Sequence, residues 1–176
     1  YAQDTRQRPT HDVYGLAAQA ALPVARAAEP GAATYLAAGT TYAPLAGPGI
    51  ASLLHARLRE HGQLDHPVEI SSHSGICSSA SAALVGAARA VASGAHRAAV
   101  CAAAEQASEV LKSSAIQVPD DRDRHASLRD SQWFMAVFLR FMLSDGAGAF
   151  LLEDRPAETG LSLRVDWTHS ASFAHE

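Results

Sequence analysis

The chain has 176 residues, a length that suits one domain with a sizeable core. Its formal net charge of −4 and its sequence pI of about 6.1 argue against a basic surface, so neither nucleic acid nor a membrane is an expected partner. Two cysteines make no disulfide framework, so we expect a cytoplasmic protein. No apolar run reaches the roughly 20 residues that span a bilayer, and no signal peptide is expected.

Apolar periodicity predicts helices that alternate with short strands. The expected helices cover residues 13–28, 50–61 and 78–93, and the expected strands cover residues 34–40, 67–71 and 98–104. This alternation is typical of a parallel sheet that helices cover on both faces. The predicted fold class is therefore α/β.

Residues 111–142 interrupt this alternation, and we interpret them as an inserted loop and apolar segment. The loop is charged around residues 119–124, and residues 133–142 are strongly apolar and aromatic. Two interpretations of the apolar segment stay open: a buried helix or strand of the core, or the wall of a substrate channel or subunit contact. Two further strands are expected after it, one entered through the glycines at 146 and 148 and one at residues 160–167.

Cys77 is the main candidate for a chemical role, because it follows a predicted strand and a turn of small residues and heads a predicted helix. A helix N-terminus favours negative charge, and hence the thiolate, which is the nucleophilic form of cysteine. Gly75 and Ser78 leave room for a substrate. The alternative is that Cys77 is a small buried hydrophobe.

Other reactive side chains fit structural roles better. Cys101 lies in an apolar run and is expected to be a buried strand residue. His73 lies close enough in sequence to touch the Cys77 turn, but a structural imidazole is the preferred interpretation. Glu105, just past a strand, is expected to be a hydrogen-bonded structural carboxylate rather than an acid or base. The nine histidines show neither the HExxH pattern nor paired Cys/His spacing, so no metal site is expected.

Three segments occur in an order that resembles the thiolase superfamily. They are the turn SGICSS at residues 74–79, the strand that ends near Glu105, and the element DGAGA at residues 145–149. The resemblance is closest to the β-ketoacyl-(acyl carrier protein) synthase III branch and covers residues 13–167. It implies a thiolase-like fold, here one βαβαβ-type half with a mixed, mostly parallel sheet covered by helices.

The resemblance also implies an activity. Cys77 would take an acyl group from a coenzyme A or acyl-carrier-protein thioester and pass it to a malonyl-type extender, in fatty acid or polyketide biosynthesis. No cofactor is implied beyond the thioester substrate itself. Two alternatives stay open: acyl transfer to an oxygen or nitrogen acceptor, and a non-catalytic ketosynthase-like dimer partner. An unrelated α/β hydrolase is disfavoured, because the Gly-x-Ser-x-Gly elbow is incomplete.

The family draws a histidine and an asparagine from a C-terminal half. His169 and His175 lack that context, so their roles are not carried over. Residues 1–176 are therefore expected to be an N-terminal half that lacks its first strand region.

We also expect a homodimer in which the apolar strand at 98–104 pairs across the two-fold axis, because apolar edge strands are seldom left exposed. We expect the acyl pocket to be lined by the aromatic side chains Trp133, Phe134, Phe138 and Phe141.

Overall fold

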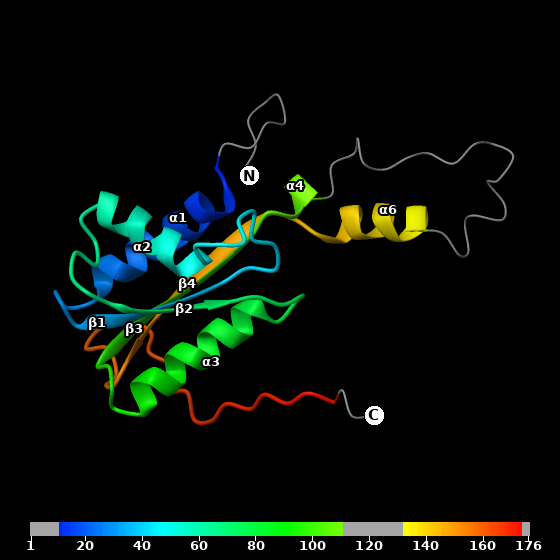
Figure 1. Ribbon diagram of the computed structural model, residues 1–176. Helices are drawn as coiled ribbons and strands as arrows, with labels where there is room; N and C mark the ends of the chain where they lie inside the picture. Colours follow the sequence, from blue (N-terminus) through cyan, green and yellow to red (C-terminus); the bar gives the residue numbers. More distant parts are fainter. Residues whose placement is uncertain (1–10, 111–131, 174–176) are drawn as a thin grey trace, which may run out of the picture.

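The computed structural model describes residues 11–110 and 132–173 (Figure 1). The helices are α1 (Val13–Ala27), α2 (Ile50–Glu60), α3 (Ser79–Ala92), α4 (Ala107–Val110) and α6 (Gln132–Met142). The strands are β1 (Ala33–Gly39), β2 (Glu69–His73), β3 (Ala98–Glu105) and β4 (Gly146–Glu153). The six elements predicted up to residue 104 and the strand after the glycines are confirmed.

The four strands form one sheet in the order β2-β1-β3-β4. Strand β1 runs parallel to β2 and β3, whereas β4 is antiparallel to β3. Helices α1 and α2 cover one face of the sheet and α3 covers the other (Figure 1). The predicted fold class, a mixed and mostly parallel sheet covered by helices, is confirmed.

The alanine-rich composition shapes the packing, because side chains on β1 and β3 alternate between two cores. Leu36 and Val100 face α1 and α2, while Ala37 and Cys101 face α3. Ala83 of α3 is fully buried against this second core. Short side chains bring the helix close to the sheet, and burial on both faces explains why β3 is apolar throughout.

The position of β3 corrects the structural basis of the predicted dimer. Strand β3 is hydrogen-bonded to β1 along one side and to β4 along the other, so it is an interior strand. It therefore has no free edge for a second chain, and its apolar character reflects burial. Within the described part of the chain, the edge strands are β2 and β4.

The apolar segment forms α6, which stands away from the sheet and its covering helices (Figure 1). Phe134 is 47% exposed, Phe138 44% and Phe141 85%. The interpretation of this segment as core is therefore wrong for the described side chains. Residues 111–131, which hold the charged loop, lie outside the described residues.

The strand predicted at residues 160–167 is wrong, because the structure has no strand there. The segment runs alongside α3 without forming a buried face, and Leu161 and Leu163 are 86% and 80% exposed. An alternating pattern becomes a strand only when another strand pairs with it, and none does so among residues 11–110 and 132–173.

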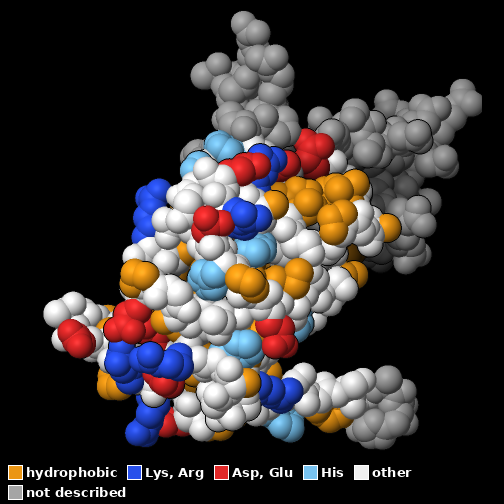
Figure 2. Space-filling model, turned by 60° about the vertical axis from the view of Figure 1, so that its left-hand side comes forward, with side chains coloured by type: hydrophobic (Ala, Val, Ile, Leu, Met, Phe, Trp, Pro, Cys, Tyr) orange, Lys and Arg blue, Asp and Glu red, His pale blue; other side chains and the backbone are white. Residues whose placement is uncertain are grey.

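Charges of both signs lie side by side on the face shown in Figure 2. Among the ion pairs of the described residues, the carboxylate of Glu29 pairs with Arg97 at 3.8 Å and also with Arg155. In the described residues, no helix has the length and apolar character that a membrane crossing requires.

Candidate active site

Cys77 lies in the short turn between β2 and α3, and its side chain is exposed. Its backbone φ angle is +60°, which places a non-glycine residue in the left-handed region. That conformation costs an L-residue roughly 1–2 kcal/mol, and such strain persists where the surrounding structure holds it. Chain direction thus reverses sharply at the cysteine, and the thiol is presented at the start of α3. The alternative of a buried hydrophobic Cys77 is wrong.

Glu105, the last residue of β3, holds the surroundings of this turn together. Its Oε1 atom accepts hydrogen bonds from the Thr41 backbone N–H (2.7 Å) and the Thr41 hydroxyl (2.8 Å). It also accepts a hydrogen bond from the Ser79 hydroxyl at 3.2 Å. The predicted hydrogen-bonded structural carboxylate is confirmed. It joins the loop after β1, the end of β3 and the first residue of α3.

Two glycines allow the backbone to pack closely around the turn. A Cβ atom on Gly39 would lie closer than 3.0 Å to the Ser79 carbonyl oxygen, nearer than real Cβ atoms come. Gly75 has a φ angle of +139°, which favours glycine, and its carbonyl oxygen lies 3.4 Å from the Thr41 hydroxyl. Glycine is therefore needed at the end of β1 and within the turn itself.

His73 has the structural role that was expected of it. Its Nε2 atom lies 3.0 Å from the Ser71 hydroxyl, which itself accepts a hydrogen bond from the Tyr35 hydroxyl at 2.9 Å. Ser71 is thus free to donate its own hydrogen to a neutral imidazole. Burial lowers the pKa of His73 and favours that neutral form.

Cys101 contrasts with Cys77, as predicted. It is 3% exposed in the core under α3, and burial raises the pKa of its thiol to about 12. A thiol that stays protonated is a poor nucleophile. Of the two cysteines, Cys77 has the exposed side chain and Cys101 the buried one.

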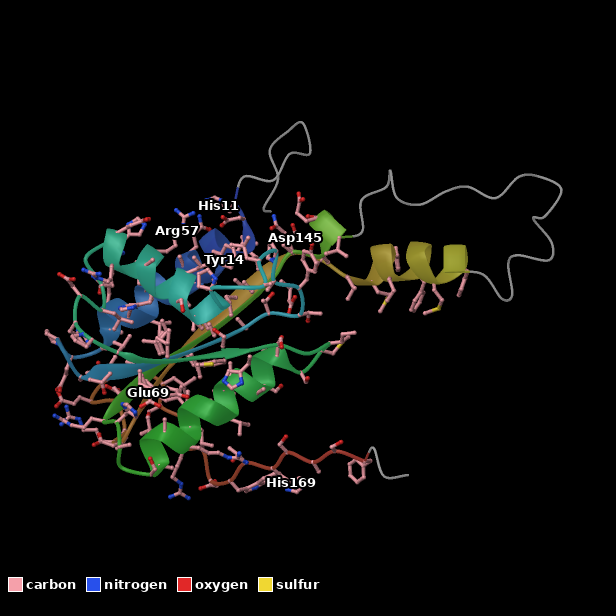
Figure 3. The ribbon with its side chains drawn as sticks, viewed as in Figure 1. His11, Tyr14, Arg57, Glu69, Asp145 and His169 are labelled. Atoms are coloured by element: carbon pink, nitrogen blue, oxygen red, sulfur yellow. The ribbon has the colours of Figure 1, made fainter. Side chains whose placement is uncertain are left out.

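A cavity of about 490 Å³ opens beside the first turns of α3. Its lining is mostly small and comprises Ala80, Ser81, Leu84, Cys101, Ala103, Ala104, Glu105, Ser144, Asp145, Gly146, Ala147, Gly148 and Phe150. Asp145 lies beside α4 at this end of the sheet (Figure 3). Its carboxylate accepts hydrogen bonds from the backbone N–H (2.9 Å) and the hydroxyl (2.6 Å) of Ser108. The DGAGA element at residues 145–149 thus anchors α4 next to the cavity through Asp145.

Of the aromatic residues predicted to line the acyl pocket, the three described ones, Phe134, Phe138 and Phe141, do not line this cavity. Phe134 and Phe138 stack on each other on α6, with ring centroids 6.1 Å apart, and Phe141 is exposed on the same helix. The side chain of Trp133 lies outside the described atoms. Their assignment to an acyl pocket therefore stays a prediction.

The structure describes one of the two C-terminal histidines, and it does not place that residue at the Cys77 turn. His169 lies on the segment that follows α3 on the side away from the sheet (Figure 3), and His175 lies outside the described residues. Across residues 11–110 and 132–173, no group of three or more His, Cys, Asp or Glu side chains is arranged to hold a metal ion.

Three features of the site were not predicted: the left-handed backbone of Cys77, the contact between Gly39 and Ser79, and the role of Thr41. The sequence did hold a signal for the Gly39 contact and the role of Thr41, because a glycine followed by two threonines ends an apolar strand. The left-handed conformation had no signal, since cysteine rarely adopts it.

Comparison with known proteins supports one architecture. No family model and no curated protein matches the chain. Solved structures do match, among them a tetronic acid condensing enzyme, AbyA1 (TM-score 0.62, 21% identity, 89% of this chain and 42% of that one). A priming β-ketosynthase of polyketide biosynthesis matches with a TM-score of 0.59 and 22% identity, over 85% of this chain and 38% of its own. The fold is thiolase-like.

The same fold is shared by 3-oxoacyl-(acyl-carrier-protein) synthase III from Aquifex aeolicus VF5 (TM-score 0.53, 22% identity, 85% of this chain and 40% of that one). The resemblance stated from sequence is thus confirmed at the level of fold. This chain spans about two-fifths of the length of these thiolase-like structures. That residues 1–176 are specifically an N-terminal half stays a prediction.

Proposed function

We propose that Cys77 accepts an acyl group from a thioester, as the first step of a condensation catalysed by a longer protein. The observation that carries the proposal is the exposed thiol of a left-handed residue at the turn into α3. The solved structures that share this fold include a condensing enzyme and a ketosynthase, which makes thioester chemistry the natural use of that thiol.

The transfer balances without a cofactor. The Cys77 thiolate attacks the thioester carbonyl, the bond to the departing sulfur breaks, and the released thiol of coenzyme A or phosphopantetheine takes up the proton that Cys77 lost. Backbone N–H groups at the start of α3 have no partner within the helix. The N–H of Cys77 and its neighbours are suited to stabilise the oxyanion that forms during attack.

The acceptor and the assembly belong to the same proposal. The favoured acceptor is the carbanion of a decarboxylated malonyl-type extender; an oxygen or nitrogen acceptor is the alternative. Groups that stabilise an enolate are expected from parts of the protein beyond this chain, which spans about two-fifths of the matched structures.

We propose a homodimer formed through a free sheet edge, with β2 as the candidate. We also propose an acyl pocket that includes Trp133, Phe134, Phe138 and Phe141.

Intact mass after incubation with a panel of acyl thioesters tests the proposal. The panel contains short and long acyl groups, each presented on coenzyme A and on an acyl carrier protein. We expect one acyl group per chain for the wild type and for Cys101→Ala, and none for Cys77→Ala. Acylation of a folded Cys77→Ala variant, or no acylation of a folded wild type with any donor, would overturn the proposal. The second result would favour the non-catalytic partner instead.

A further inference from the structure

We propose that Glu105 is a positioning residue that keeps the Cys77 turn in its left-handed conformation. For its effect on acyl transfer this inference rests on the proposed function, but its structural part stands without it. Glu105 reaches Cys77 only indirectly. It acts through Thr41 and Ser79.

All three hydrogen bonds to Glu105 end on the same oxygen atom. Oε1 of Glu105 accepts two hydrogen bonds from Thr41 and one from Ser79, at distances of 2.7 to 3.2 Å. Hydrogen bonds to an ionised acceptor are roughly twice as strong as those between neutral groups. A neutral amide oxygen at the same place would keep all three bonds in a weaker form, whereas a methyl group would leave all three donors without this acceptor.

One of these bonds holds the turn directly after the cysteine, and the other two place Thr41 against the segment before it. Ser79 lies two residues after Cys77 and is only 2% exposed, so its hydroxyl depends on a protein acceptor. Thr41 lies against the residue two positions before Cys77, because its hydroxyl is 3.4 Å from the Gly75 carbonyl oxygen. With both flanks held, Cys77 has little freedom to return to an unstrained φ angle.

The strain at Cys77 makes such a hold necessary. A residue stays in a sparsely populated backbone conformation only when its surroundings over-determine it. The contact of Gly39 with Ser79 is steric and limits how far α3 can move toward the sheet. The Glu105 carboxylate adds hydrogen bonds to Ser79 and Thr41, so its removal should release the turn while the sheet beneath stays intact.

Acyl transfer and alkylation respond differently to a released turn. Attack on a thioester requires the sulfur and the oxyanion-binding N–H groups to be placed together, and misplacement of about 1 Å can cost about a hundredfold in rate. Alkylation by iodoacetamide requires only an accessible thiolate. A positioning residue should therefore change the ratio of the two rates, which a general loss of stability would not.

The experiment compares Glu105→Ala and Glu105→Gln with Glu69→Ala as a matched control. Glu69 begins β2 at the end of the sheet opposite to Glu105, where it pairs with His96 at 3.2 Å. Figure 3 shows it well away from Asp145, which lies at the end where Glu105 is found. Each variant is assayed for amide hydrogen exchange at residues 74–79 and in β3, for iodoacetamide labelling of Cys77, and for acylation by acetyl-coenzyme A.

In Glu105→Ala we expect exchange at residues 74–79 to accelerate about tenfold or more, with exchange in β3 unchanged. Acylation should fall by about ten- to a hundredfold, while alkylation changes less than about threefold. Glu105→Gln should recover most of the loss because it retains an acceptor oxygen, and Glu69→Ala should match the wild type at the turn.

Unchanged exchange at residues 74–79 in a folded Glu105→Ala variant would overturn the inference. An equal acceleration of exchange at these residues in Glu69→Ala would also overturn it. If Glu105→Ala fails to fold, Thr41→Val replaces it. That variant removes one of the three donors, and unchanged exchange at the turn would again overturn the inference. Faster exchange in Glu105→Ala together with no acylation of the wild type by any donor of the thioester panel would uphold the positioning role and refute the proposed function, so the two failures are distinct.

Discussion

The end of β1 and the first residue of α3 meet through Gly39 and Ser79, with no room for a side chain between them. A Cβ atom on Gly39 would lie closer than 3.0 Å to the Ser79 carbonyl oxygen. This contact places the helix that follows Cys77 directly on the sheet. The Cys77 turn therefore depends on a backbone approach between segments 40 residues apart in sequence.

Gly39→Ala should lower the free energy of unfolding by about 1–3 kcal/mol, the usual cost of forcing an extra carbon into a packed site. Chemical denaturation measures this change. Gly148→Ala is the control, because Gly148 lies in the same sheet with nothing within 4 Å of its Cβ position. A loss equal to that of the control would mean that the close approach does not exist.

The left-handed backbone of Cys77 predicts an unusual order of variants. Cys77→Gly should be more stable than Cys77→Ala by about 1 kcal/mol, because glycine adopts a positive φ angle without steric cost and alanine does not. At most positions the order is the reverse. The midpoint of denaturation of the two variants measures the difference, and an alanine variant of equal or greater stability would contradict the φ angle of +60°.

The two thiols should differ sharply in reactivity. At neutral pH we expect limited iodoacetamide to label the exposed Cys77 and to leave Cys101 unlabelled, because burial raises the pKa of Cys101 to about 12. Peptide mapping locates the label, and denatured protein, in which both thiols should react, is the control. Equal labelling of both cysteines in the native protein would refute a special environment at Cys77.

His73 predicts a loss of stability in mild acid. Burial lowers its pKa in the folded state below the ordinary value of 6.5, so the unfolded chain binds a proton more readily. Stability is therefore unaffected by His73 above pH 6.5 and decreases as the pH falls below that value. Denaturation of the wild type and of His73→Gln between about pH 8 and pH 5 tests this, with a shallower decline expected for the variant. Parallel declines would remove His73 as the cause.

Local patterns in the sequence were enough to predict much of the fold. Apolar periodicity and glycine positions located α1, α2, α3 and β1 to β3 within a few residues, because each element buries one face or both. The turn at Cys77 was also predictable, since small residues between a strand and a helix restrict what the chain can do.

Features that depend on distant neighbours were not predictable in this way. The apolar sequence of β3 shows that helices cover its two faces. It does not show whether other strands of the sheet pair with both of its edges. The strand expected at 160–167 failed because its pattern needs a partner strand. The hydrogen bonds from Thr41 and Ser79 to Glu105 join three segments whose proximity only the fold creates.

The central claim is that Cys77 is the acyl acceptor and that groups outside this chain complete the reaction. Mass mapping of peptides after incubation of the 176-residue chain with an acyl thioester and a malonyl thioester tests it most directly. We predict slow acylation located on Cys77 and no condensed product, because each missing enolate-stabilising donor costs on the order of a hundredfold in rate. An acyl group found on Cys101 or another residue, or a condensed product made by this chain alone, would contradict the account.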